Sequence, residues 1–203
     1  MGSAAIFADV RICVVDDNRN FQNLFRTVLR GMGFRRVDVH GDPHEALSLV
    51  TSTPVDITFV DLVMPRQNGI EWTRSARRSS RLANPTMPIA LVSGHVDRRV
   101  LEAAVHAGVD DVLVKPLSPA TLYRHISRLL RHPVPYVRGP EGYFGPDLRL
   151  VRNRPAAADP TAGTPMREER TETGRRRYAR TLPGLHVERP REPVYDVDQA
   201  FLD

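Results

Sequence analysis

Five short apolar runs, each followed by a segment with helical spacing, constrain the fold of this chain more than any other feature. The runs are residues 11–15, 36–39, 56–60, 88–92 and 112–114. Strands that alternate with amphipathic helices build a parallel sheet with helices on both faces. Four of the runs are almost continuously apolar, as expected of strands buried on both sides. The sequence therefore predicts an α/β fold, a doubly wound (βα)5 three-layer sandwich.

Capping residues mark the ends of three of the expected helices. Asp42 and Ser118 each stand directly before a proline. A short polar N-cap followed by proline in the first turn is a typical helix start. Gly108 is expected to end the fourth helix, because glycine readily adopts the left-handed conformation that closes many helices.

The composition of the chain changes at Arg131. Residues 1–131 hold 7 of the 17 prolines, whereas the 72 residues that follow hold the other 10. Beyond this point the periodic apolar pattern fades, which is typical of a segment that cannot bury enough surface to offset its ordering entropy. We expect a folded domain at 9–131, an aromatic extension at 132–150, and a largely disordered, Pro- and Arg-rich tail with an acidic end at 151–203.

The aromatic extension contains Tyr136, Tyr143 and Phe144 in a strip rich in proline and glycine. Clustered aromatic side chains of this kind often dock against a folded surface. We therefore expect the segment from Tyr136 to Leu150 to pack back onto the folded domain.

Cysteine content and hydropathy indicate where the protein acts. Cys13 is the only cysteine, so no internal disulfide can form, and the first ten residues lack the apolar core of a signal peptide. No stretch approaches the roughly 18 apolar residues of a membrane-spanning helix. We expect a cytoplasmic protein that has no membrane segment.

Polar residues follow four of the predicted strands at the point where each strand ends. Asp16 and Asp17 follow the first strand, Asp61 the third, Ser93 the fourth and Lys115 the fifth. The carboxyl ends of parallel strands share one edge of the sheet, where ligands of open α/β folds bind. Three carboxylates in one pocket repel one another unless a cation joins them, and few hard oxygen ligands with room for water favour Mg²⁺.

The same residues suit phosphoryl chemistry. A metal-bound Asp61 could attack a phosphoryl group and form an acyl phosphate, with Lys115 paired to the phosphoryl oxygens and Ser93 donating a hydrogen bond. Lys115 is the only lysine among 29 basic residues, and the other 28 are arginine. Because a compact ammonium fits a narrow site that a planar guanidinium does not, this exception marks Lys115 as a site residue.

Six short motifs together resemble the receiver domain of two-component response regulators over residues 9–131. They are Val14–Asp17, Val60–Pro65, Asn68–Gly69, Ser93–Gly94, Ala107–Gly108 and Val114–Pro116. The resemblance implies a flavodoxin-like fold with the parallel strand order 2-1-3-4-5. It also implies that Lys115 and Pro116 are joined by a cis peptide.

By the same resemblance, Asp61 is the phosphoacceptor, Ser93 the hydroxyl switch and Lys115 the phosphate-pairing lysine. Asp16, Asp17, Asp61 and the backbone carbonyl of Val63 would hold Mg²⁺. The phosphoryl donor would be a sensor histidine kinase or a phosphotransfer protein, and the output a phosphorylation-dependent protein-binding face on the fourth and fifth helices. A phosphorylation-dependent dimer is left open, and no enzyme activity is expected beyond the chain's own phosphotransfer and autodephosphorylation.

The chain departs from the family pattern at three positions. The aromatic switch residue of the family lies three positions before the lysine, where this chain has Val112, so the usual coupling is not expected. The side chains that flank the path of the hydrolytic water in the family are here Val63 and His95. We expect them to set the lifetime of the phosphorylated form.

Two other classes of function stay open. The formal net charge is +5, and Arg175, Arg176 and Arg177 lie in the tail, so an adaptor could use this arginine-rich segment to bind a nucleotide second messenger or nucleic acid. A solvated linker would have the same composition. No three amphipathic helices follow Arg131, which argues against a conventional DNA-binding output domain. An α/β phosphohydrolase would suit Asp61, but Val63 stands where such enzymes resembling haloacid dehalogenase carry a second acid.

Overall fold

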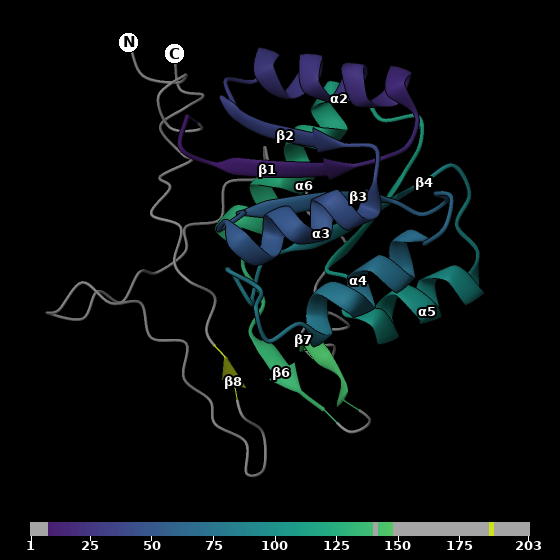
Figure 1. Ribbon diagram of the computed structural model, residues 1–203. Coiled ribbons are helices and arrows are strands. Elements are labelled where there is room, and N and C mark those ends of the chain that lie inside the picture. The colour runs from purple at the N-terminus through teal and green to yellow at the C-terminus, as the bar shows by residue number, and fades with distance from the viewer. Residues whose placement is uncertain (1–7, 140–141, 148–186, 189–203) are drawn as a thin grey trace, which may run out of the picture.

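The computed structural model describes residues 8–139, 142–147 and 187–188. Its main sheet has five parallel strands in the order β2-β1-β3-β4-β5, which confirms the predicted flavodoxin-like fold (Figure 1). The strands are β1 (Arg11–Val15), β2 (Arg36–His40), β3 (Ile57–Asp61), β4 (Ile89–Ser93) and β5 (Asp111–Val114). The connecting helices are α2 (Arg19–Gly31), α3 (Pro43–Ser52), α4 (Gly69–Arg78), α5 (Arg98–Ala107) and α6 (Pro119–Arg131).

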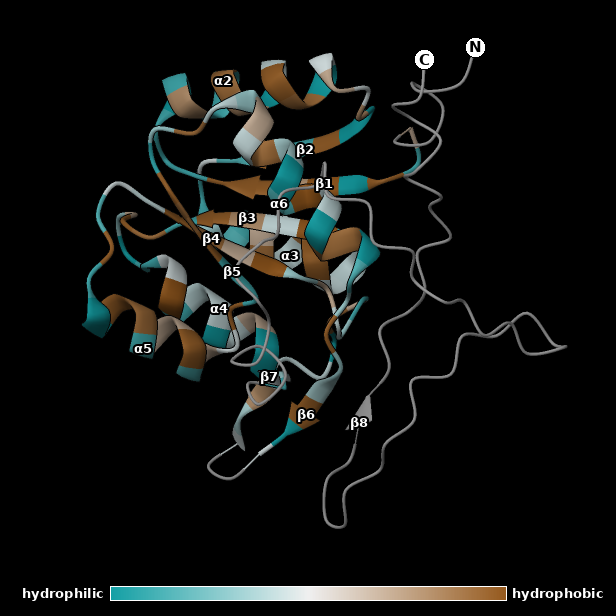
Figure 2. Cartoon of the chain, turned by 180° about the vertical axis from the view of Figure 1, so that it is seen from behind, coloured by the Kyte–Doolittle hydropathy of each residue, from teal (hydrophilic) through white to brown (hydrophobic). Residues whose placement is uncertain are grey.

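The helices cover both faces of the sheet and divide the core into two halves. Alternation of side chains along β1 sends Ile12 and Val14 toward α2 and α6, and Cys13 and Val15 toward α3, α4 and α5. Figure 2 shows mainly hydrophobic residues along the central strands and both hydrophobic and hydrophilic residues along the helices. The three-layer arrangement follows from burying both faces of a nearly continuous apolar sheet.

The predicted caps form as expected. The side chains of Asp42 and Ser118 accept hydrogen bonds from the first turns of α3 and α6. Gly108 ends α5 with φ 85°, a left-handed conformation that side chains with a Cβ rarely adopt. These caps fix where each helix begins or ends relative to the carboxyl edge of the sheet.

A small antiparallel hairpin follows α6 and contacts the base of the domain. It consists of β6 (Tyr136–Arg138) and β7 (Phe144–Pro146), and β8 (Val187–Glu188) pairs with the other edge of β6. Tyr136 is 1% exposed, and its ring lies 5.6 Å from that of Phe144. A Cβ on Gly145 would lie 2.7 Å from the Cα of Gly108, so the hairpin and the end of α5 are in direct backbone contact.

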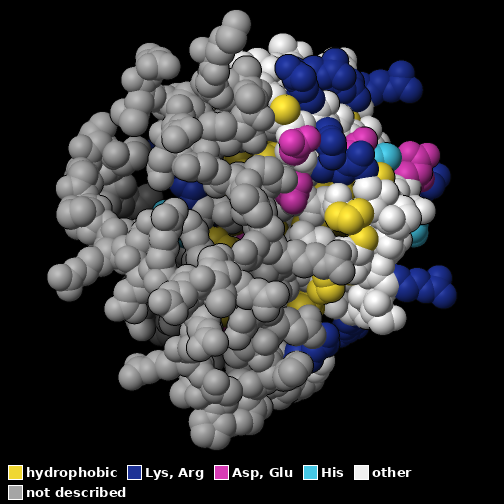
Figure 3. Space-filling model, turned by 90° about the vertical axis from the view of Figure 1, so that its left-hand side faces the viewer, with side chains coloured by type: hydrophobic (Ala, Val, Ile, Leu, Met, Phe, Trp, Pro, Cys, Tyr) yellow, Lys and Arg dark blue, Asp and Glu magenta, His cyan; other side chains and the backbone are white. Residues whose placement is uncertain are grey.

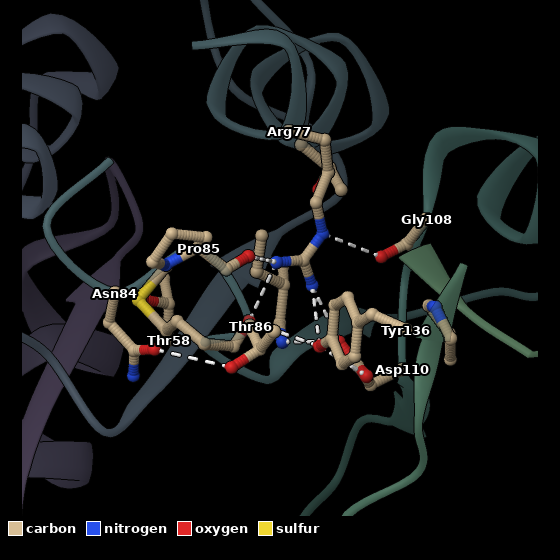
Figure 4. A network of polar contacts seen from close by, with 12 residues as sticks. Thr58, Arg77, Asn84, Pro85, Thr86, Gly108, Asp110 and Tyr136 are labelled. Carbon is tan, nitrogen blue, oxygen red and sulfur yellow. Dashed lines mark hydrogen bonds and ion pairs between the residues drawn. The ribbon is translucent and has the colours of Figure 1, made fainter. Parts of the chain in front are cut away.

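Arg77 and Asp110 form a buried ion pair beneath this hairpin (Figure 4). The Nη2 atom of Arg77 donates to Asp110 Oδ2 at 2.7 Å and to the Tyr136 hydroxyl at 3.1 Å. Its Nε atom donates to the carbonyl of Gly108 at 3.0 Å, and Nη1 to that of Met87 at 2.7 Å. One guanidinium thus joins α4, the end of α5, the start of β4 and the hairpin.

The Tyr136 hydroxyl completes this network. It donates to Asp110 Oδ1 at 2.7 Å while it accepts from Arg77. Burial raises the pKa of Tyr136 well above its ordinary value; the Arg77 guanidinium opposes this rise and the Asp110 carboxylate adds to it. The hydroxyl therefore stays protonated and keeps its hydrogen bond to the Asp110 carboxylate.

Exposed charges of both signs lie at the end of the sheet where the strands begin. Arg11 pairs with Asp38 at 3.7 Å, and Arg36 with Asp9 at 3.2 Å. Figure 3 views this side and shows basic and acidic side chains next to one another on the described surface. Within the described ranges, every helix is too short or too polar to cross a bilayer.

Several sequence expectations concern residues outside the described ranges. The expected disorder of the tail at 151–203 concerns such residues, apart from β8. So do the proposed binding role of the arginine cluster at 175–177 and the expected packing of residues 148–150.

Candidate functional site

Asp16, Asp61 and Lys115 meet at the carboxyl edge of the sheet, as predicted. The Nζ atom of Lys115 donates to Asp61 Oδ1 at 2.7 Å and to Asp16 Oδ2 at 3.0 Å. Asp16 is 2% exposed and Asp61 8% exposed, whereas the Lys115 side chain is 25% exposed. Two buried carboxylates therefore share one ammonium that solvent can still reach.

Backbone contacts orient each carboxylate. Asp16 Oδ1 accepts from the N–H of Asn18 at 2.8 Å, and Asp61 Oδ2 accepts from the N–H of Val63 at 2.9 Å. Gly69, the first residue of α4, lies so near the carbonyl of Asp61 that a Cβ there would come within 2.3 Å of it. The Asn68–Gly69 pair thus lets α4 begin against the backbone of the central carboxylate.

The charges of this cluster depend on one another. Burial raises the pKa of Asp16, and the hydrogen bonds from Lys115 and Asn18 only partly oppose it. For Lys115, burial lowers the pKa, but the hydrogen bonds to Asp61 and Asp16 outweigh it and the net pKa is raised. The ammonium stays charged because it donates hydrogen bonds to both carboxylates.

The structure brings together two of the three predicted metal-binding carboxylates. Asp16 and Asp61 are both bound by Lys115, whereas Asp17 is exposed. In the part of the chain that the structure describes, no group of three or more His, Cys, Asp or Glu side chains forms a metal cluster. The two buried carboxylates still suit Mg²⁺, since this ion is usually held by one or two carboxylates and several waters.

Ser93 ends β4 beside the cluster and is engaged with its own loop. Its hydroxyl donates to the carbonyl of His95 at 2.5 Å and accepts from the N–H of His95 at 3.1 Å. The Lys115–Pro116 bond is cis, as the resemblance implied. Val112 packs half-buried against the core on the side of α3, α4 and α5. The Val63 side chain is 75% exposed at the mouth of the site.

Sequence reasoning did not identify Phe21 as part of this site. Phe21 lies in the first turn of α2 and packs against the core. Its ring also lies beneath the ammonium of Lys115, with 3.6 Å between Nζ and the ring centroid. No local motif pointed to this contact, because it joins residues 94 positions apart.

Comparison with known proteins agrees with this geometry. A family model described as the response regulator receiver domain matches residues 12–127. The DNA-binding response regulator MtrA of Mycobacterium tuberculosis is 33% identical over 121 residues, which cover 60% of this chain and 50% of MtrA. The chain spans about half the length of the curated relatives it matches.

Two solved structures show the same arrangement. Chemotaxis protein CheY4 of Vibrio cholerae has a TM-score of 0.56 and 25% sequence identity, covering 60% of this chain and 98% of that one. The receiver domain of sensor histidine kinase PA1611 from Pseudomonas aeruginosa, which has a magnesium ion in its active site cleft, has a TM-score of 0.53 and 27% identity. That match covers 59% of this chain and 95% of the PA1611 receiver.

Proposed function

Because the chain belongs to the response regulator receiver family, we propose that Asp61 accepts a phosphoryl group from a phosphohistidine of a sensor histidine kinase or a phosphotransfer protein. The observation that carries this proposal is the pair of buried carboxylates, Asp16 and Asp61, held by the single lysine of the chain. Such a site already holds the cation that a transferred phosphoryl group needs.

The transfer is a displacement at phosphorus. An oxygen of the Asp61 carboxylate attacks the phosphoryl group, an O–P bond forms, and the P–N bond to the donor imidazole breaks with its electron pair returning to nitrogen. Lys115 turns its ammonium from Asp61 to the phosphoryl oxygens, and the N–H of Val63 lies beside the acceptor carboxylate.

We assign the metal to the same edge of the sheet. Asp16 and Asp61 would hold Mg²⁺, with the backbone carbonyl of Val63 and Asp17 through water completing the set. The ion supplies charge that offsets the negative phosphoryl oxygens during transfer.

The output would follow from Ser93. To donate to a phosphoryl oxygen, the hydroxyl must leave the carbonyl of His95, which frees the loop that leads into α5. Such a change biases a two-state loop and helix. Leu101 and Val105 of α5 and Val114 of the edge strand β5 are exposed apolar residues, and they suit a protein-binding face.

We further propose that residues 132–150 complete the receiver of residues 9–131 and are no separate output domain. The buried Tyr136 and its contacts with Arg77 and Asp110 support this assignment. A downstream target that binds α5, β5 and α6 would then read the phosphorylated state directly.

Chemical mapping tests the phosphoacceptor. Incubation with acetyl phosphate and Mg²⁺ should add one phosphoryl group, and borohydride reduction of the acyl phosphate followed by peptide mapping should place it at residue 61. Omission of Mg²⁺ should suppress the label. A label on a serine or histidine, or unchanged labelling in the presence of a chelator, would contradict the proposal.

A second prediction concerns the lifetime of the phosphorylated form. Val63 and His95 follow Asp61 and Ser93 by two positions, and the apolar Val63 side chain cannot orient an attacking water. Val63→Asn and His95→Ala should each change the rate of autodephosphorylation, measured by the decay of labelled protein after the donor is removed. Equal decay in wild type and both variants would exclude a role for these side chains.

A further inference from the structure

We propose that Phe21 is a positioning residue for Lys115, whose ammonium its ring holds inside the site by a cation–π contact. The inference rests on the proposed function, because it concerns how the site keeps its cation ready for the phosphoryl group. The Nζ atom lies 3.6 Å from the ring centroid. A cation over a ring face within about 6 Å of the centroid is attracted by the ring quadrupole.

The surroundings of the ring favour this contact. Phe21 lines the same recess as the buried carboxylates of Asp16 and Asp61. Cation–π contacts are stronger where the cation is partly desolvated. The Lys115 side chain is nevertheless 25% exposed, so its flexible stem could swing outward into solvent. The ring opposes that swing.

Local structure fixes the ring in place. Asp16 accepts from the N–H of Asn18, and the Asn18 side chain, as N-cap of α2, accepts from the N–H of Phe21 at 3.2 Å. The Phe25 ring supports that of Phe21 with 5.0 Å between centroids, and Phe59 lies 5.3 Å beyond Phe25. Asp16 accepts a hydrogen bond from Lys115 and also stabilises the turn at Asn18. That turn places the Phe21 ring beneath the Lys115 ammonium.

The ring differs from the carboxylates in one functional respect. When Asp61 becomes an acyl phosphate, its carboxylate loses its charge and its ion pair with Lys115 ends. The attraction to the Phe21 ring does not depend on the charge of either carboxylate. Phe21, together with the Asp16 carboxylate, thus keeps the ammonium in the site while it moves to the phosphoryl oxygens.

Fluorinated phenylalanines test the electrostatic nature of the contact. Fluorine withdraws electron density from the ring face and changes ring shape little, so mono-, di- and trifluorophenylalanine placed at position 21 weaken the attraction in steps. We expect the rate of phosphorylation by acetyl phosphate to fall with each fluorine, by about fivefold for the trifluoro ring. The thermal midpoint should stay unchanged.

The same series at Phe25 is the matched control, because this ring belongs to the same helix but has no cation over it among the residues that the structure describes. The rate should not depend on fluorination there. Equal effects of fluorination on the phosphorylation rate at positions 21 and 25 would overturn the inference about Phe21 but not the proposed function. Absence of any label at Asp61 in wild type would instead overturn the proposed function.

A second readout needs neither metal nor phosphoryl donor. Since the chain has a single lysine, selective ¹³C-lysine labelling gives one ε-methylene NMR signal. The ring current of Phe21 should shift this signal upfield of the ε-methylene signal of free lysine. In Phe21→Leu the signal should move back to the position of free lysine. A wild-type signal at the position of free lysine would show that the ring does not hold the side chain.

Discussion

Replacing Arg77 by methionine is expected to lower the free energy of unfolding by about 3–5 kcal/mol. The Arg77 side chain is 2% exposed and that of Asp110 is 7% exposed. Methionine keeps an unbranched apolar stem like that of arginine. The substitution therefore measures the contribution of the guanidinium to stability. Without it the Asp110 carboxylate stays buried with no opposite charge, and the carbonyls of Gly108 and Met87 lose a donor. Urea denaturation measures the change.

Arg78 is the matched control, since it is the next residue and is exposed at the end of α4. Arg78→Met should change the free energy of unfolding by no more than about 0.5 kcal/mol. The double variant Arg77→Met, Asp110→Leu should recover part of the stability, because it removes both buried charges. A loss below 1 kcal/mol in Arg77→Met, about the level of a single neutral hydrogen bond, would contradict the proposed importance of the ion pair.

Arg77 also shows why part of the fold could not be predicted from the sequence. In the run Arg74–Ser80, Arg77 and Arg78 both look like solvated cations near a helix end, where the macrodipole favours positive charge. Only the packing of α4 against the end of α5 and the hairpin distinguishes the buried one. The docking of Tyr136 was anticipated from its aromatic context, but the polar partners of its hydroxyl were not.

The neighbouring acids Asp110 and Asp111, at the start of β5, make the same point. Asp110 binds Arg77 on one face of the sheet, whereas Asp111 pairs with His125 and Arg128 of α6 on the other. Alternation requires opposite faces. The sequence alone does not predict the ion-pair partners of Asp110 and Asp111, because tertiary contacts between distant residues determine these pairs.

The sheet and the central site could be predicted because they follow from local sequence patterns and do not depend on unforeseen tertiary contacts. The apolar runs and the polar residues at their ends are local patterns, and parallel topology then forces Asp16, Asp61 and Lys115 to one edge. The boundaries shifted by one residue, so Asp61 and Ser93 are the last residues of β3 and β4. Asp17, which was placed in the metal site by its position after the first strand and by the family resemblance, is exposed, and its part in holding the metal stays a prediction.

The second large effect is expected at Asp61. Asp61→Asn should abolish labelling by acetyl phosphate, because a neutral carboxamide oxygen is no nucleophile toward phosphorus. Asparagine keeps the shape of the side chain and an oxygen that can accept from the N–H of Val63, so the fold should persist. Asp56→Asn, just before the opposite end of β3, is the control and should be labelled as wild type.

Lys115→Arg then separates acceptance of the phosphoryl group from its signal. The arginine variant keeps a positive charge and the acceptor carboxylate, so it should still be labelled. Its wider planar fork cannot occupy the place where one ammonium contacts Asp16, Asp61 and the Phe21 ring. Amide NMR shifts of α5 on phosphorylation should therefore be lost although the label is present. If both variants lost the label, Lys115 would be required for the transfer itself; if α5 shifted in the arginine variant as in wild type, any cation at this position would suffice.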